Sequence, residues 1–223
     1  MKKLKMIIYV IFSLPKTIVF NLMALPIKQS LKLPFFIGYN VKIENIHKGI
    51  VRLPNKISMF MIRFGAGGSK GLSKERQSKI MLSRGSVTFE GKARFAEGNI
   101  LTVSGDLIFG EGFSSNKNCF ISCQNKMTIG KNVLLGWNVN IIDNNGGNHT
   151  VLVDNMKKSS FGSVFIGDHV WLCSYSSVMK NTQISNDSIL AWGSILTKKI
   201  SDSNCLLAGS PAEIKQKDIE WQI

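Results

Sequence analysis

The sequence predicts an all-β fold in which short strands joined by tight turns wind into triangular coils that stack as a prism. Three observations predict it. A large aliphatic residue returns at every sixth position, a small or β-branched residue follows it four positions later, and turn-forming Gly, Asn and Asp stand between them. A helical period of 3.6 does not produce this spacing. Three such strands close one coil, and successive coils stack about 4.8 Å apart, the spacing of paired strands.

The repeat is clearest in the second half of the chain. The aliphatic positions of its main block are Ile166, Leu172, Val178, Ile184, Leu190 and Leu196. The small positions of that block are Val170, Ser176, Thr182, Ser188 and Ser194. Earlier blocks run through Ile129, Leu135 and Ile141 and, more loosely, through Phe89, Phe95 and Leu101. We therefore expect a parallel β-helix domain over residues 49–212, followed by a tail or short helix over residues 213–223.

Residues 1–48 form a basic, apolar segment that we expect to associate with a membrane. The whole net charge of +14 lies in residues 1–100, which hold 18 Lys and Arg against four Asp and Glu; residues 101–223 hold ten of each. In residues 1–34 the lysines alternate with apolar runs, which favours an anionic membrane surface over nucleic acid as the acidic partner. Each lysine near such a surface contributes roughly 1 kcal/mol of binding.

Four arrangements of this segment are compatible with the sequence. An interfacial anchor is favoured, because Pro15 and Lys16 divide the apolar run into two stretches, each about half of the roughly 20 residues that a spanning helix needs. The alternatives are a spanning helix that tolerates Lys16, a cleaved signal peptide, and a helical hairpin packed on the protein body or on a partner subunit.

One segment interrupts the repeat and carries a histidine. From Ile141 to Ile166 the chain advances 25 positions, which is not a multiple of six. The chain must therefore leave the prism, and we expect an extruded loop over residues 143–163. This loop contains His149, and an imidazole has an ordinary pKa of about 6.5, which suits proton transfer near neutral pH. Loops held by a rigid scaffold commonly carry catalytic residues.

The tandem [LIV]-G-x-x-[small]-x ladder over roughly residues 85–212 resembles the hexapeptide-repeat acyltransferases. More narrowly, LPIKQSLKLPFF and FEGKARFAEGNILTV are similar to segments of the bacterial capsule and surface-polysaccharide O-acetyltransferases. The resemblance implies a left-handed parallel β-helix and a homotrimer with clefts between neighbouring prisms. It also implies acetyl-CoA as the donor substrate, with no metal ion.

The resemblance assigns roles within the extruded loop. IIDNNGGNH matches the family's pattern of an aliphatic residue, an Asp and a following His, although it runs about two residues longer, through Gly146 and Gly147. The match implies that His149 is the general base and that Asp143 orients it. A simple turn cap is the alternative role for Asp143.

Three further segments, VWLCSYSSV, GSILTKKI and LAGSPAEI, resemble the family's cofactor contacts. The residues carried over to acetyl-CoA binding are Trp171, Ser174, Thr197 and Lys198. Trp192 stands beside the expected pantetheine path, where the family has a small residue. Glu213 stands where some relatives place a basic residue for the cofactor's phosphate, so Lys215, or Lys217, is the candidate replacement.

The remaining histidines and the cysteines carry no predicted chemistry. His169 falls at a turn of the repeat and His47 lies outside its good blocks, so three imidazoles are not expected to converge on a zinc ion. Four cysteines are too few for a disulfide scaffold, which favours a reducing compartment. Cys119 and Cys123 are four positions apart with no second pair, unlike a zinc ribbon.

The resemblance implies an acetyl-CoA-dependent O-acetyltransferase that acts on a sugar hydroxyl of a surface polysaccharide or of its polyprenyl-linked precursor. We expect it to lie peripherally on the cytoplasmic face of the bacterial inner membrane. An N-acetyltransferase acting on an amino-sugar nucleotide would use the same scaffold and the same base. A β-helix that has lost catalysis and only tethers partners at the membrane is the alternative from another class.

Overall fold

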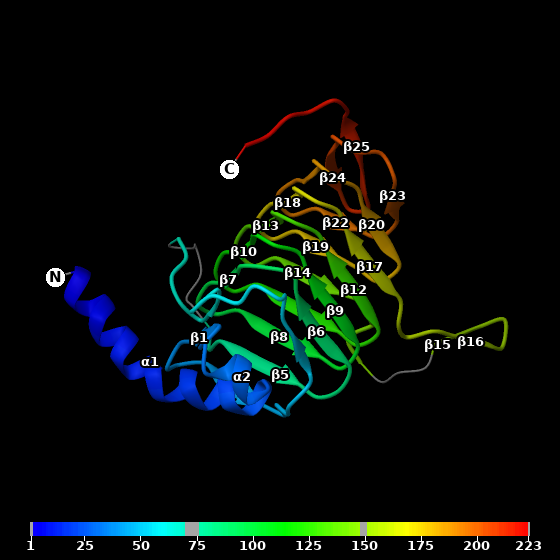
Figure 1. The fold of residues 1–223 in the computed structure, drawn as a ribbon. Coiled ribbons are helices and arrows are strands. Elements are labelled where there is room, and N and C mark those ends of the chain that lie inside the picture. The colour runs from blue at the N-terminus through cyan, green and yellow to red at the C-terminus, as the bar shows by residue number, and fades with distance from the viewer. Residues whose placement is uncertain (1, 70–75, 148–150, 223) are drawn as a thin grey trace.

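The computed structural model describes residues 2–69, 76–147 and 151–222, with side chains from residue 6 onward. The chain passes through three sheets in turn and adds one strand to each sheet per coil (Figure 1). The sheets form the three faces of a prism. The all-β fold predicted from the period of six is confirmed.

Each face is a sheet whose neighbouring strands run parallel, apart from a final antiparallel strand on the first face. The first face consists of β1 (Phe35–Ile37), β4 (Ile62–Phe64), β7 (Ala93–Phe95), β10 (Phe113–Ser115), β13 (Leu134–Leu135), β18 (Trp171–Leu172), β21 (Ile189–Leu190), β24 (Leu206–Gly209) and β25 (Ala212–Gln216). The second consists of β2 (Lys42–Glu44), β5 (Lys79–Leu82), β8 (Ile100–Val103), β11 (Phe120–Cys123), β14 (Asn140–Ile142), β19 (Ser177–Val178) and β22 (Ile195–Leu196). The third consists of β3 (Val51–Arg52), β6 (Ser86–Phe89), β9 (Asp106–Phe109), β12 (Lys126–Ile129), β17 (Ser163–Ile166), β20 (Thr182–Ile184) and β23 (Lys199–Ile200).

The aliphatic ladder fills the interior of the prism. On the third face Ile129 pairs with Ile166 and Ile166 with Ile184, so each lies directly over the last. All six aliphatic residues of the main repeat block are fully buried. In the first coils the ladder becomes a stack of phenylalanines, such as Phe89 over Phe109, whose ring centroids are 5.2 Å apart. The period of six therefore decides which side chains make the core.

Helix α1 (Lys2–Ala24) closes the open edge of the first face, where β1 has no further strand to pair with. Polar side chains at every fourth position of the helix accept hydrogen bonds from backbone N–H groups at alternate residues in and after β1, at 3.0–3.1 Å. The pairs, helix residue first, are Asn21 with Phe35, Thr17 with Ile37 and Ser13 with Tyr39. Four residues of helix advance about 6 Å and two residues of strand about 6.6 Å, so the two periods stay in step.

Pro15 lies inside α1 without ending it, so the prediction that Pro15 and Lys16 divide the segment was wrong. Contacts with the prism hold the helix at this point. Lys16 donates a hydrogen bond from Nζ to the Val41 carbonyl at 2.8 Å and another to the Tyr39 carbonyl. Docking on the prism therefore offsets the hydrogen bond that a proline removes from a helix. A short second helix, α2 (Ile27–Ser30), follows.

The other face of α1 is apolar and exposed. The stretch Met6–Ala24 has a mean hydropathy of 1.8, is long and apolar enough to cross a membrane by length and composition, and is only 22% buried. The exposed apolar side chains within it include Ile7, Ile8, Ile11, Phe12, Ile18, Val19, Leu22 and Met23. Figure 1 shows α1 passing beneath the first coil and rising away from the prism toward its N-terminal end. The helix thus has one polar face tied to β1 and one apolar face turned outward.

Two element boundaries differ from those expected. The prism begins at β1 and β2, before residue 49, because FFI and KIE already pair in register with later coils. At the other end, residues 212–216 form strand β25, so the predicted short C-terminal helix was wrong. Gly209, with φ of 110°, lies at the end of β24 where the chain reverses. Ala212 and Ile214 then alternate with exposed charged residues and face the core, which is the period of a strand.

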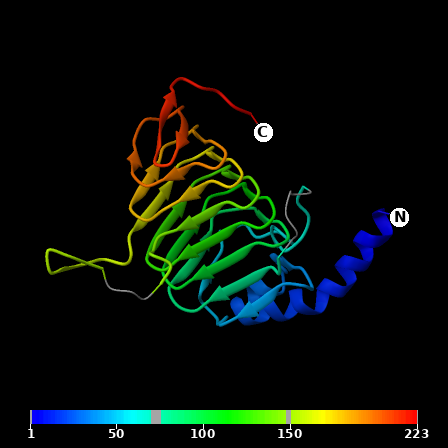
Figure 2. The ribbon, with the colours of Figure 1, turned by 180° about the vertical axis from the view of Figure 1, so that it is seen from behind.

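The chain leaves the prism between β14 and β17, within the predicted extruded loop at 143–163. Strands β15 (Val151–Val153) and β16 (Met156–Lys158) pair antiparallel as a hairpin within this segment. The hairpin projects well away from the prism in both views (Figures 1 and 2). This hairpin forms an arm on the side of the prism, separate from the end that α1 covers.

Candidate active site

A groove of about 520 Å³ lies at the base of the extruded loop, on the corner between the second and third faces. Its lining residues are Asn144, Asn145, Gly147, Val151, Met179, Lys180 and Thr197. The first four belong to the first half of the loop, and the others follow strands β19 and β22. Thr197 is one of the residues predicted to contact the cofactor. His149 lies outside the described residues, so its role as general base stays a prediction; Gly147 and Val151, which flank its segment, both line this groove.

Asp143 anchors the loop to the prism. Its fully buried carboxylate accepts hydrogen bonds from the backbone N–H groups of Gln124 and Asn125, both at 2.8 Å, and from Asn144 Nδ2 at 3.1 Å. The Asp143 carbonyl also accepts the N–H of Gly162 at 2.8 Å, which ties the two ends of the loop together. The carboxylate thus caps the turn between β11 and β12, which is the alternative role that the sequence left open. Contact between Asp143 and His149 stays a prediction.

Lys180 supplies a positive charge to the groove, and the second half of the extruded loop holds this side chain in place. Lys180 donates a hydrogen bond from Nζ to the Ser159 carbonyl at 2.6 Å, which holds the amine at the rim. Lys180 and Met179 were not singled out from the sequence, although a signal was present. Val178 pairs with Leu196, so VMK occupies in one coil the positions that LTK occupies in the next. Lys180 therefore corresponds to Lys198 one coil earlier.

Lys198 and Lys215 meet at the end of the prism, next to the groove. Their Nζ atoms lie 3.9 Å and 3.7 Å from the two carboxylate oxygens of Glu213. All three side chains are about half exposed, so the shared carboxylate contributes little to stability in solvent. Glu213 nevertheless holds two amines within reach of one another. A phosphate would be attracted to this pair as a point-charge site.

The other predicted cofactor residues lie on a different part of the surface. Ser174 is buried, and its Oγ accepts the Trp137 N–H at 2.9 Å, so it supports a corner between the first and second faces. Trp192 is 54% exposed on the same corner, with its ring centroid 5.0 Å from that of Tyr175. Trp192 points outward and does not fill the groove. Within one chain, therefore, the predicted residues are divided between two corners.

Trp171 is half-buried on the first face and lies beside the C-terminal tail. The ring of Trp221 lies 5.9 Å from that of Trp171, and its Nε1 donates a hydrogen bond to the His169 carbonyl at 3.2 Å. His169 has φ of 52°, in keeping with its predicted turn position, and its Nδ1 lies 2.9 Å from Asp187 Oδ1. Trp221 could not be found from the repeat, since it lies beyond the last coil. In the described parts of the chain no three His, Cys, Asp or Glu side chains are arranged to hold a metal ion.

Comparison with known proteins finds sugar O-acetyltransferases that match about half of the chain. No protein-family model matches the sequence. The chain is 31% identical over 111 residues to a galactoside O-acetyltransferase of Lactococcus lactis, covering 49% of this chain and 52% of that protein. It is 33% identical over 105 residues to the galactoside O-acetyltransferase of Escherichia coli K12, covering 47% and 51%. The matched segment spans about half the length of these curated relatives.

A solved structure shows the same fold. The polySia-specific acetyltransferase NeuO aligns with a TM-score of 0.55 and 18% identity, over 85% of this chain and 72% of that one. The fold is thus the left-handed parallel β-helix built on hexapeptide repeats. Repeat, fold and relatives together fit a hexapeptide-repeat acetyltransferase.

Proposed function

We propose that the protein is an acetyl-CoA-dependent O-acetyltransferase that acts on a sugar hydroxyl of a surface polysaccharide or of its lipid-linked precursor. The observation that carries the proposal is the groove at the base of the extruded loop. Residues on both sides of His149 line it, and Thr197, on the adjoining coil, lines its other wall. Two of the matched relatives are named as galactoside O-acetyltransferases, which supports a sugar hydroxyl as the acceptor.

The reaction needs one base and accurate positioning. The His149 imidazole takes the proton of the acceptor hydroxyl as the oxygen attacks the thioester carbonyl of acetyl-CoA. The tetrahedral intermediate collapses with cleavage of the carbon–sulfur bond, and the imidazolium returns the proton to the departing CoA thiolate. Holding both substrates in one groove replaces a bimolecular encounter by an intramolecular step, which contributes several kcal/mol.

The groove suits the donor substrate chemically. Met179 and Val151 offer apolar surface to a pantetheine arm, and the exposed Asn145 offers an amide to its peptide groups. Lys180 stands at the rim, and Lys198 with Lys215 lies beyond Thr197 at the end of the prism. These amines are the chain's own candidates for the phosphates of CoA.

The division of the predicted residues between two corners supports a homotrimer. Trp171, Ser174 and Trp192 belong to the first face or to its border with the second, whereas Thr197 lies on the border between the second and third. A side-to-side assembly would set the aromatic corner of one prism against the groove of the next. Each cleft would then take His149 from one chain and tryptophan contacts from its neighbour.

The two faces of α1 support a peripheral position on the cytoplasmic face of the bacterial inner membrane. A helix tied to β1 through Asn21, Thr17 and Ser13 is not free to cross a bilayer by itself. Its outward apolar face matches an interfacial helix, which inserts side chains below the headgroups while lysines meet anionic lipid. The enzyme would then lie where a polyprenyl-linked sugar is presented.

The proposal is tested by acetyl transfer from acetyl-CoA to a panel of lipid-linked and nucleotide-linked sugars. His149→Ala should lower turnover at least about a hundredfold, as expected for a lost general base. His47→Ala, which removes an exposed histidine far from the groove in sequence, is the matched control and should keep full activity. An active His149→Ala enzyme would overturn the assignment of the base. Transfer to an amino group of a nucleotide sugar would overturn the acceptor, and the absence of any turnover would favour a non-catalytic scaffold.

A further inference from the structure

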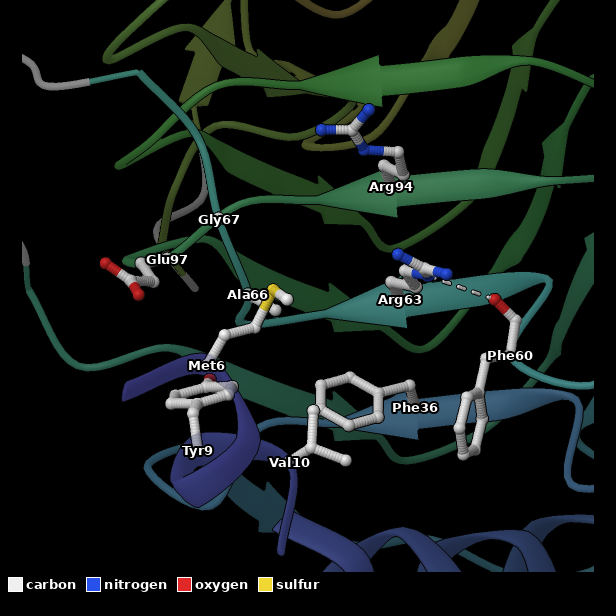
Figure 3. Close-up of a pocket in the computed structure, with 10 residues that line it drawn as sticks. All are labelled: Met6, Tyr9, Val10, Phe36, Phe60, Arg63, Ala66, Gly67, Arg94 and Glu97. Atoms are coloured by element: carbon white, nitrogen blue, oxygen red, sulfur yellow. Dashed lines mark hydrogen bonds between the residues drawn. The ribbon is translucent and has the colours of Figure 1, made fainter. Parts of the chain in front are cut away.

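A second pocket, of about 470 Å³, lies between the N-terminal half of α1 and the first coils of the first face (Figure 3). Its apolar walls come from Met6 and Val10 of the helix and from Phe36 and Phe60 of the prism. Two guanidinium groups, of Arg63 and Arg94, border it. It shares no lining residue with the groove at the extruded loop. The catalytic proposal therefore leaves this pocket without a function.

The two arginines are placed side by side by the register of the β-helix. Arg63 in β4 pairs with Arg94 in β7, and Phe36 in β1 pairs with Arg63 on the other side. The residues that flank both arginines are buried, so the guanidinium groups point out of the prism on the same face. Adjacent strands are about 4.8 Å apart, and like charges directly opposite one another are destabilising. An anion between them would relieve this repulsion.

No acidic side chain in the described parts of the chain neutralises this pair. Arg63 donates one long hydrogen bond, from Nε to the Phe60 carbonyl at 3.4 Å, and neither arginine forms an ion pair there. The acid that borders the pocket, Glu97, lies 2.9 Å from Lys117 Nζ and is already engaged. The pocket therefore combines two unneutralised guanidinium groups with an apolar wall.

We propose that this pocket binds the phosphate of an anionic membrane glycerophospholipid through Arg63 and Arg94. Guanidinium groups match phosphate oxygens in geometry as well as in charge. The acyl chain next to the headgroup would run against Val10, Phe36 and Phe60, whose two aromatic rings have centroids 5.4 Å apart. One wall of the pocket is α1 itself, the element whose outer face we place against lipid. The inference rests on the proposed membrane association and is independent of the proposed acetyl transfer.

The position of the pocket favours bulk lipid over the lipid-linked sugar substrate. Arg94 lies in β7 and Thr197 follows β22, four coils further along the prism, which is about 20 Å at the spacing of paired strands. The two sites also lie on different faces. A sugar joined directly to a phosphate held between the arginines would not reach the groove of the same chain.

The test compares two double variants of the full chain that lose the same charge. Arg63→Gln with Arg94→Gln removes the pocket pair. Arg52→Gln with Arg84→Gln removes two exposed arginines outside the pocket and is the matched control. Binding is measured by flotation with vesicles of phosphatidylcholine alone and vesicles that also contain phosphatidylglycerol. The pocket variant should bind the anionic vesicles at least about tenfold more weakly than wild type, because it loses both guanidinium contacts to the lipid phosphate, while the control changes by less than about threefold.

Equal losses in both variants would overturn the proposal, because diffuse attraction would then explain the binding. Wild-type protein that binds neither kind of vesicle would refute the membrane association as well as the lipid pocket. The failure of the pocket alone is therefore distinguishable from the failure of the membrane association. Native mass spectrometry of the detergent-purified wild type supplies a second measurement that does not depend on a variant. One glycerophospholipid per chain is expected, whereas a polyprenyl phosphate, or no lipid at all, would overturn the assignment.

Discussion

The ring of His169 lies flat against that of Trp221, with centroids 3.9 Å apart and planes inclined by 2°. This stack fastens the C-terminal tail across the first face, next to Trp171. The tail therefore forms part of the surface on which the predicted acetyl-CoA contact lies. The contact joins the C-terminal tail to the turn before β18. The hexapeptide repeat does not predict this contact, because the tail lies outside the repeat.

Trp221→Ala should loosen this tail. Aromatic stacks of this kind contribute about 0.5–1.5 kcal/mol beyond the area they bury, so the free energy of unfolding in urea should fall by about 1 kcal/mol. The fluorescence of the remaining tryptophans should shift to the red as Trp171 gains contact with water. Gln222→Ala, at the exposed neighbouring position, is the control and should change neither quantity. Unchanged stability in Trp221→Ala would show that the tail is not held by the stack.

Asp143→Asn should act on stability and leave the chemistry in place. The amide keeps one acceptor oxygen where the carboxylate serves two backbone N–H groups, and a buried donor left unpaired costs about 1–3 kcal/mol. We expect a loss of this size in urea unfolding and an unchanged pH dependence of kcat for acetyl transfer. If Asp143 instead orients His149, the pH profile of kcat would move, and Asp143 would then be a positioning residue for the base.

Ile11→Asp with Ile18→Asp should release the protein from membranes. Both side chains lie on the outward face of α1, 57% and 44% exposed, so the carboxylates disturb no internal packing. Flotation with anionic vesicles should show at least a tenfold loss of binding. Two aliphatic side chains that become buried in the membrane contribute about 3 kcal/mol or more to the free energy of binding. Leu152→Asp with Phe165→Asp adds the same charge at positions 61% and 43% exposed on the arm and the third face. Similar losses in both double variants would count against α1 as the anchor.

The thiols should be unreactive near neutral pH. Burial raises the pKa of Cys119 to about 12 and that of Cys173 to about 11, and burial together with Asp143 raises the pKa of Cys123. Alkylation of the folded protein at pH 8 should therefore be slow and should accelerate as the pH approaches 11. The unfolded chain releases these protons near pH 9, so the free energy of unfolding should fall as the pH rises from about 9 to about 12. Rapid labelling of Cys173 at pH 8 would contradict the burial, and urea-unfolded protein supplies the reference rate.

The interior of the prism was predictable because its contacts obey a local rule. Each strand pairs with the strand one coil away, so Ile166, Leu172 and Val178 take their places from spacing alone. The same rule indicated where the chain departs, between Ile141 and Ile166. The groove was predicted only through Thr197 and the loop, although Lys180 repeats the position of Lys198.

The parts that were missed lie where the repeat stops. In the sequence, Asn21 and Thr17 are polar residues within an apolar helix and have no evident role. In the structure they accept hydrogen bonds from the backbone of β1, which lies at the edge of its sheet. Residues 212–216 alternate between buried and exposed positions, which is the period of a strand, yet a helix was expected there. Arg63 and Arg94 are ordinary surface arginines in the sequence, and only the register brings them together.

The protection of β1 by α1 has a counterpart at the other end of the first face, where β25 folds back on β24 and carries Glu213 and Lys215. Stacked parallel coils can in principle be extended indefinitely, because each last strand is a template for another. Here a helix blocks one end of this face and a charged, reversed strand blocks the other. Extension of this face is thus blocked at both ends, which favours association of copies flank to flank, through the outer surfaces of the prism.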